Sequence, residues 1–332
     1  MSQETRIRCF VDFDKDGKQI SHLQLPYSSN VSAYGWIGIP IAVIRNGRGP
    51  TLYLGAGNHG DEYEGQIVLA RLIRELDPGA IQGRLIVMPA QNLPAVLAGA
   101  RCSPIDAGNL NRSFPGDPDG SPTAAIAHFI ESVLLPMCDA VVDLHSGGKT
   151  LDYLPSALVR RPPGRDPNAA AKRAALEAFR APVGYIVSDA REDRTLTAAA
   201  DRVGIVGVGT ELGGAGTVTL ETLAVARRGL QNMLRHFGLV EGEADGPPSR
   251  LTEVKGPEYY VHAPCRGLFE PAFELGDEIK AGQPAGHIHF VDDPAMPPVE
   301  VRFRGEGLVI CKRPIVQVER GDCLAHLATD LA

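Results

Sequence analysis

Long apolar runs, basic tracts and paired cysteines are all missing from this chain of 332 residues. No run approaches the roughly 18 apolar residues of a membrane helix, so we expect no membrane span and no membrane partner. Residues 1–6 lack the apolar core of a secretory signal, and the six cysteines are scattered without a C-x-x-C pair. These absences exclude a thiolate zinc knuckle and predict a cytoplasmic protein with reduced thiols.

The charge balance excludes another class of partner. Lys and Arg number 33 against 40 Asp and Glu, a formal net charge of −7. A mildly acidic chain without a basic stretch is poorly suited to neutralise phosphates, so we expect no nucleic-acid partner. Hydrophobic residues make up 44% and charged residues 22%, which predicts a folded globular protein. Its length suits one large domain and a smaller one.

Hydrophobic periodicity and turn residues organise the chain. The first 45 or so residues are β-rich, with short apolar runs at 20–25 and 37–44. Strands then alternate with helices, and this alternation predicts an α/β fold, a mixed sheet with helices on both faces. The strands are expected at 51–56, 84–89, 139–144, 154–159, 183–187 and 204–210, and the helices at 62–76, 123–134, 168–179 and in a long segment ending near 236.

A Gly- and Pro-rich acidic stretch at 241–250 has the composition of a linker. Helical periodicity disappears after it, and short β runs follow at 259–262, 286–290 and 308–312. The sequence therefore predicts a catalytic-sized domain over 1–245 and a small all-β domain over 250–332.

Residues 55–60 match the dinucleotide fingerprint G-x-G-x-x-G between a predicted strand and a predicted helix. That helix opens with Asp61 and Glu62, which would repel a diphosphate. The next strand ends at 89–92 without an acid for a ribose. Both departures disfavour a nicotinamide cofactor.

His59 and Glu62 indicate a different chemistry. They lie three residues apart, across a strand end and the first turn of a helix, so they can approach one ion from the same side. Imidazole and carboxylate suit Zn²⁺, and a catalytic zinc site takes three protein ligands with one open position. The third ligand should be another histidine at the end of a neighbouring strand.

His145 meets this requirement, because it directly follows the apolar strand 139–144. Asp143 shares its strand face and is placed to orient it. Glu211 stands at the end of strand 204–210, where a carboxylate can act as general base and acid of a zinc hydrolase. A helix N-terminal glutamate, before a helix near residue 217, is the alternative interpretation of Glu211.

These segments resemble the succinylglutamate desuccinylase/aspartoacylase family, a branch of the zinc-carboxypeptidase fold. The resemblance rests on residues 57–62, 109–112, 143–147 and 210–214 and extends from about residue 51 into the C-terminal β region. It implies that His59, Glu62 and His145 bind one zinc ion per chain and that Glu211 is the general base and acid. The segment 267–286 is similar to a biotinyl/lipoyl-like hammerhead, which implies a barrel-sandwich-like C-terminal domain.

The same resemblance assigns substrate contacts to the loop 101–116. Asn111 and Arg112 match the pair that holds the substrate α-carboxylate. Arg101 resembles the arginine that polarises the scissile carbonyl, although its distance from Arg112 along the chain is longer than in aspartoacylase.

Within the family, residues 60–65, 103–106 and 145–152 are most similar to the Nα-acetyl-diaminobutyrate deacetylases of ectoine degradation. Such a substrate carries a free cationic amine. Glu64, Asp152 and Asp193 are all candidates for its counter-charge, and the spacing does not choose among them.

The predicted function is zinc-dependent hydrolysis of the amide bond of a small Nα-acylated amino acid. The alternatives are a zinc carboxypeptidase acting on peptides, another deacylase of the same family, and a binding protein on a hydrolase fold. The expected partner is the small-molecule substrate, and the chain is compatible with a homo-oligomer.

Overall fold

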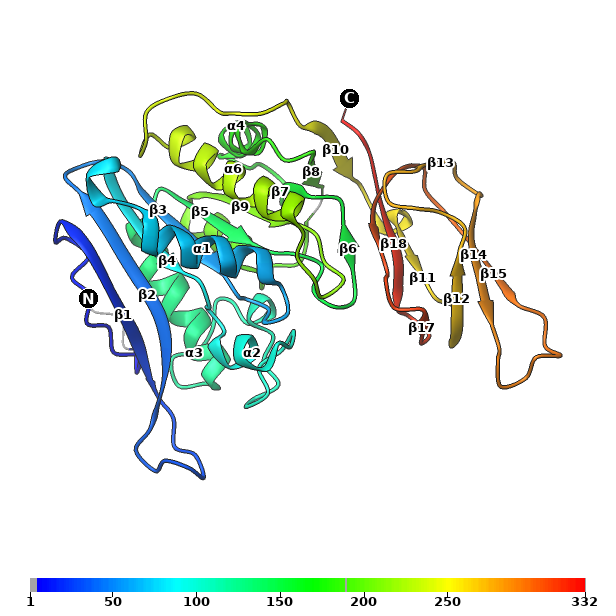
Figure 1. Ribbon diagram of the computed structural model, residues 1–332, viewed down its shortest axis with the longest axis horizontal. Helices are drawn as coiled ribbons and strands as arrows, with labels where there is room; N and C mark the ends of the chain where they lie inside the picture. The colour runs from blue at the N-terminus through cyan, green and yellow to red at the C-terminus, as the bar shows by residue number, and fades with distance from the viewer. Residues whose placement is uncertain (1–4, 189, 332) are drawn as a thin grey trace.

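A large mixed β-sheet is the centre of the computed structural model, which describes residues 5–188 and 190–331 (Figure 1). The strand order is β1-β2-β4-β3-β5-β9-β7-β8-β10, and the sheet continues through β18, β16 and β13. The expected α/β class is confirmed. The strands before the linker are β1 (Gly17–Pro26), β2 (Trp36–Asn46), β3 (Thr51–Ala56), β4 (Gly83–Met88), β5 (Ala140–Leu144), β6 (Asp152–Tyr153), β7 (Ser156–Arg160), β8 (Val183–Val187) and β9 (Val206–Glu211).

Helices cover both faces of this sheet, as expected. Alternate residues of a strand point to opposite faces, so Leu52 and Leu54 pack in one core with α1, α4 and α6, while Tyr53 packs in another with α3 and α5. The helices are α1 (Tyr63–Glu75), α2 (Leu93–Ala98), α3 (Pro122–Phe129), α4 (Ala169–Phe179), α5 (Leu196–Val203) and α6 (Leu220–His236).

Strands β3, β5 and β9 run parallel to one another at the middle of the sheet. Their carboxyl ends therefore open at one edge, where ligands bind in open α/β folds. β7 is antiparallel to β9, with Ser156 opposite Glu211. This register places the loop after β5, the end of β9 and the short strand β6 around the same edge.

The C-terminal region both extends the main sheet and forms a second, separate one. β10 (Arg250–Val254) pairs in parallel with β8, and β18 pairs with β10, so the main sheet runs on past the linker. A second, four-stranded sheet has the order β15-β14-β12-β17. The remaining strands are β11 (Tyr260–His262), β12 (Gly267–Pro271), β13 (Glu278–Ile279), β14 (Pro284–His289), β15 (Val299–Arg302), β16 (Gly307–Lys312), β17 (Gln317–Val318) and β18 (Cys323–Asp330). The division at 245/250 stays a prediction.

Several elements differ from the sequence expectation. The helix expected over 123–134 is α3 followed by a wider π-helical turn at Ile130–Leu134. The short helices α2 and α5 were not expected at all. The strand expected at 204–210 is β9, whose last residue is Glu211. No helix of the described residues is long and apolar enough to cross a membrane.

Candidate metal centre

The loop between β3 and α1 carries the first two predicted ligands. Gly57 takes a φ of +66°, a conformation that side chains rarely adopt. Gly60 lies so close to the Ala95 carbonyl that a Cβ would stand 1.9 Å from its oxygen. These two glycines let the loop turn back tightly, so that His59 and Glu62 face the end of β5. Glu62 caps α1 rather than starting it.

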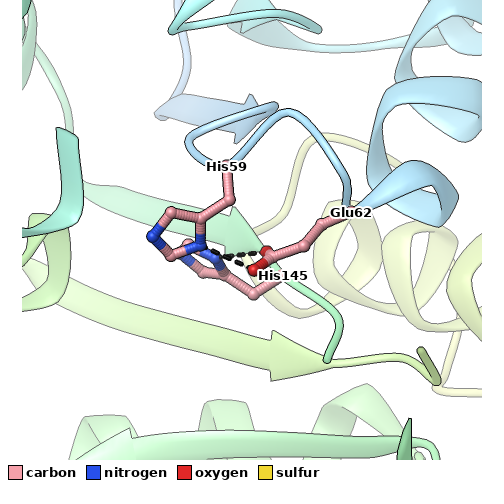
Figure 2. A group of neighbouring side chains, drawn as sticks. All are labelled: His59, Glu62 and His145. Carbon is pink, nitrogen blue, oxygen red and sulfur yellow. Dashed lines mark hydrogen bonds and ion pairs between the residues drawn. The ribbon is translucent and has the colours of Figure 1, made fainter. Parts of the chain in front are cut away.

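His59, Glu62 and His145 converge on one point (Figure 2). Nδ1 of His59 lies 2.6 Å from Oε1 of Glu62, and Nδ1 of His145 lies 2.8 Å from Oε2 of the same carboxylate. One ligand atom from each residue lies within 4.8 Å of the others, and all three side chains are buried. The structure therefore brings together the three residues that the sequence analysis chose, from a loop and from the end of a separate strand.

The far nitrogen of each ring is held by an outer residue. Nε2 of His145 lies 2.8 Å from Oδ2 of Asp143, and Nε2 of His59 lies 3.0 Å from Oδ1 of Asn109. Partners of this kind fix the ring and its tautomer at metal sites, leaving the other nitrogen free for the ion. The expected role of Asp143 has this geometry, whereas Asn109 received no role from the sequence.

The electrostatics of the cluster favour a positive charge. Burial opposes ionisation of Glu62, but the imidazoles of His59 and His145 outweigh it and lower the pKa of the carboxyl. Burial likewise opposes a charged His145, yet Asp143 and Glu62 raise the pKa of this ring well above its ordinary value. Glu62 between the two imidazoles, with Asp143 behind His145, therefore makes a pocket that stabilises a cation, either a proton or a metal ion.

Glu211, the last residue of β9, lines the same cavity. Burial and the neighbouring Glu62 raise its pKa to about 8. Its Oε2 is buried and has no hydrogen-bond partner within residues 5–188 and 190–331. The alternative of a helix N-terminal glutamate is wrong, because α6 begins at Leu220 and its N-cap is Thr219.

Arg101 reaches the cluster from its loop. Its Nη1 lies 3.5 Å from Oε1 of Glu62 and 3.4 Å from Nδ1 of His59. The side chain is about half exposed, so it stands at the mouth of the cavity with its guanidinium directed at the candidate metal point.

Asn111 and Arg112 lie in a single helical turn beside the cluster. Nδ2 of Asn111 is 3.2 Å from Nε2 of His145, and its Oδ1 accepts a hydrogen bond from the backbone of Leu196 at 2.9 Å. Arg112 is paired with Glu192 at 3.2 Å. That pairing could not be found from the sequence, because Glu192 lies on a loop far along the chain.

The cavity has a volume of about 370 Å³ and reaches from the ligand cluster into the C-terminal region. One wall is aromatic and consists of Tyr153, Tyr185, Tyr260 and His326. No sequence pattern predicts this wall, since its members come from four separate strands. Glu64, Asp152 and Asp193 do not line the cavity, and Glu64 accepts a 2.6 Å hydrogen bond from the Ser146 hydroxyl instead.

Comparison with known proteins supplies independent information. Residues 48–237 match the family described as "Succinylglutamate desuccinylase/Aspartoacylase catalytic domain". The chain is 43% identical to the N-alpha-acetyl-L-2,4-diaminobutyric acid deacetylase of Halomonas elongata, and the match covers 97% of this chain and 94% of that protein.

Two solved structures are similar over nearly the whole chain. One is the product-bound ectoine utilization protein EutE (DoeB) of Ruegeria pomeroyi, with a TM-score of 0.94 and 40% identity over 98% of this chain and 99% of that one. The other is a succinylglutamate desuccinylase/aspartoacylase of Rhodobacter sphaeroides, with a TM-score of 0.93 and 41% identity over 99% and 100% of the two chains.

Proposed function

The chain belongs to the succinylglutamate desuccinylase/aspartoacylase family, a family of amide-bond hydrolases, and we propose that it removes the acetyl group from N-alpha-acetyl-L-2,4-diaminobutyric acid. The likeness to the Halomonas elongata deacetylase over almost the full length of both chains supports this substrate. The structural observation that carries the mechanism is the position of Glu211, whose Oε2 has no hydrogen-bond partner among the described residues. It lies in the same cavity as two histidines and a glutamate that converge on one point.

We propose that His59, Glu62 and His145 hold one zinc ion per chain. The donor set fits a catalytic zinc site, because it offers two imidazoles and one carboxylate and leaves a position open toward the cavity. Asp143 and Asn109 already orient the two rings through their Nε2 atoms. A bound zinc ion supplies Lewis-acid polarisation of the scissile carbonyl and acidifies water.

Glu211 would move the protons of the reaction. Burial keeps its pKa near neutrality, where a group serves both as base and as acid. Its free Oε2 takes a proton from the attacking water and then gives it to the leaving nitrogen, so the carboxyl returns to its starting state. Arg101, whose guanidinium is directed at the ligand cluster, stabilises the negative charge that develops on the carbonyl oxygen.

Arg112 and Asn111 would hold the substrate carboxylate. A guanidinium matches a carboxylate with two parallel hydrogen bonds, and Arg112 already binds one carboxylate, that of Glu192. A substrate carboxylate would replace Glu192 as the partner. This exchange fixes the substrate at one end while its amide faces Glu211.

Hydrolysis assays with defined substrates test this function. The purified chain should contain about one zinc per chain and should release acetate from Nα-acetyl-L-2,4-diaminobutyrate. Activity should be far lower on a dipeptide with the same C-terminal residue, in which an amino-acid residue replaces the acetyl group. A carboxypeptidase, the alternative function, would cleave that dipeptide. Faster cleavage of that dipeptide, or of N-succinylglutamate or N-acetylaspartate, would replace the proposed substrate. A metal-loaded chain inactive on all of them would favour a binding protein.

We also propose a cytoplasmic location, which the six free cysteines support. A homo-oligomer stays a prediction. Val31 and Tyr34, in the turn between β1 and β2, and Trp36, at the start of β2, are exposed apolar side chains. Sedimentation analysis of the purified chain would measure the assembly state.

A further inference from the structure

His326 is a buried histidine that nothing in the described part of the chain satisfies. Its side chain lies on β18 and is only 3% exposed. Neither ring nitrogen has a hydrogen-bond partner. Leaving a buried polar group unpaired is costly, so an orphaned ring in a cavity wall indicates a ligand that completes its hydrogen bonds.

Three tyrosine rings surround this imidazole. Tyr260 stacks on it with the ring centres 4.3 Å apart and the planes 9° from parallel. Tyr153 and Tyr185 meet it edge-on, with centres at 6.2 and 6.1 Å. The faces of such rings carry negative electrostatic potential, and clusters of them bind organic cations.

The environment of His326 also determines how its ring can bind a ligand. Burial lowers the pKa of His326 to about 3, so the ring is neutral and keeps a lone pair that accepts a hydrogen bond. Burial raises the pKa of Tyr153, Tyr185 and Tyr260, and in each case the nearby Glu211 adds to the rise. This wall therefore offers a hydrogen-bond acceptor, aromatic faces and a nearby carboxyl.

The substrate named above has three groups to place besides its scissile amide: a carboxylate, an acetyl methyl and a side-chain ammonium. Arg112 is already assigned to the carboxylate and Arg101 to the carbonyl oxygen. The third arginine of the cavity, Arg160, is paired with Asp201 at 3.5 Å. A methyl group would leave the His326 nitrogens unpaired. An ammonium has three donors, so it alone can satisfy an acceptor while lying against aromatic faces.

We propose that His326, with the rings of Tyr153, Tyr185 and Tyr260, forms a subsite that binds the side-chain ammonium of the substrate and selects cationic amino acids. This inference rests on the proposed function, because it assigns a recognition site within the same reaction. The C-terminal region thereby supplies two of the four rings, Tyr260 from β11 and His326 from β18.

The test compares two substrates that differ in one group. Nα-acetyl-L-norvaline has a methyl where the diaminobutyrate derivative has its ammonium. With the zinc-loaded full chain, kcat/KM should be at least about tenfold higher for the cationic substrate, the equivalent of about 1.4 kcal/mol. His326→Phe keeps an aromatic ring without nitrogens, so this ratio should fall about tenfold, chiefly through KM for the cationic substrate. Damage to the fold alone would lower both rates together.

The control is His287→Phe, the same substitution on β14 in the four-stranded sheet, which should leave the ratio unchanged. If His326→Phe does not fold, Tyr260→Leu tests the same subsite and should also lower the ratio. Calorimetric titration of the unmodified chain with L-2,4-diaminobutyrate and L-norvaline needs no variant, and it should give at least about tenfold tighter binding of the former. Equal binding of the two, or an unchanged ratio in the folded variants, overturns the inference. Preferential binding of diaminobutyrate without hydrolysis of its acetyl derivative would overturn the proposed function alone.

Discussion

Oδ2 of Asp143 accepts a 2.8 Å hydrogen bond from Nε2 of His145, and both residues come from the end of one strand. A two-residue spacing puts both side chains on the same face, so the backbone of β5 itself sets their contact. The bond fixes the tautomer in which Nδ1 of His145 is free to face Glu62. The carboxylate also adds negative charge next to a cation site.

Asp143→Asn should therefore weaken zinc binding. The amide keeps the shape of the side chain but loses its charge, and loss of such an outer partner typically costs about 10–100-fold in metal affinity. Competition against a chelator measures the change. Asp292→Asn, which removes an exposed carboxylate paired with Arg266, should leave zinc affinity as it was. An unaltered affinity in Asp143→Asn would mean that Asp143 does not support the ligand.

Glu211→Gln should lower kcat by about 10²–10⁴-fold, because the amide cannot exchange a proton with water or with the leaving nitrogen. Zinc content, measured by elemental analysis, should stay near one per chain. Glu221→Gln, in the exposed first turn of α6, is the matched control and should keep full activity. Simultaneous loss of zinc from Glu211→Gln would place this carboxylate among the metal ligands.

Arg112→Met should raise KM with a smaller effect on kcat. Hydrogen bonds between charged groups are worth enough to change binding by about 10–100-fold. The comparison is with the substrate whose carboxylate is converted to an amide, for which the variant and the unmodified chain should differ little. Arg194→Met removes another arginine that pairs with Glu192 and should keep a normal KM. Equal KM increases for both substrates would contradict a carboxylate contact.

Lys172 offers a test of the fold away from the cavity. Its ammonium is buried and contacts Asp166 at 2.7 Å and Asp201 at 2.5 Å. Lys172→Met takes the buried ammonium away from Asp166 and leaves Asp201 with the more distant Arg160, at 3.5 Å, so the free energy of unfolding should fall by about 3–5 kcal/mol in urea titrations. Its neighbour Arg173 forms an exposed pair with Glu177, and Arg173→Met should change stability by at most about 0.5 kcal/mol. Similar losses of stability in both variants would show that the buried ion pairs of Lys172 contribute no more to the free energy of unfolding than the exposed pair of Arg173.

His326 should make stability depend on pH. Its pKa is about 3 in the folded chain, where burial lowers it, against about 6.5 in an unfolded chain. Between pH 6.5 and 3, His326 binds a proton in the unfolded chain but not in the folded chain. The free energy of unfolding should then fall by about 1.4 kcal/mol per pH unit between about 6.5 and 3.

His326→Phe lacks this proton uptake and should lose that part of the slope. The rings that face His326 are Tyr153, Tyr185 and Tyr260, whose raised pKa values keep them out of this range. Denaturant titrations at several pH values measure the free energy of unfolding of the unmodified chain and of the variant. The contributions of the other titrating groups cancel in the difference, because both proteins share those groups. Parallel pH profiles would mean that the ring is not buried as a neutral group.

The central strands and the three candidate ligands could be predicted from sequence because both depend on local pattern. Strand β3 is an apolar run closed by glycine, and His59 comes three residues after it, whereas His145 directly follows the apolar strand β5. The chemistry of a histidine at a strand end is visible without knowing which strands are neighbours. Glu211 was found for the same reason.

The parts that could not be predicted depend on pairing between distant segments. Nothing in residues 250–254 says that this strand joins β8 rather than the region after it. Helix α5 has only eight residues and its apolar face consists largely of alanine, so its helical spacing is too short and too weakly hydrophobic to stand out. Tyr260 and His326 each lie on a β-strand of the C-terminal region, and only the pairing of β11 with β18 brings their rings together.

The residues proposed for catalysis and two of the rings proposed for side-chain selectivity lie in different parts of the sequence. The three candidate ligands and Glu211 lie before the linker, whereas Tyr260 and His326 lie after it. Recombination near residue 245 would therefore replace Tyr260 and His326 of the proposed subsite, while Tyr153, Tyr185, the candidate ligands and Glu211 stayed in place. Truncation near residue 245 would remove β10 and β18 and expose the unpaired edge of β8. The C-terminal region can therefore be replaced by that of a relative, but it cannot be deleted without exposing this edge.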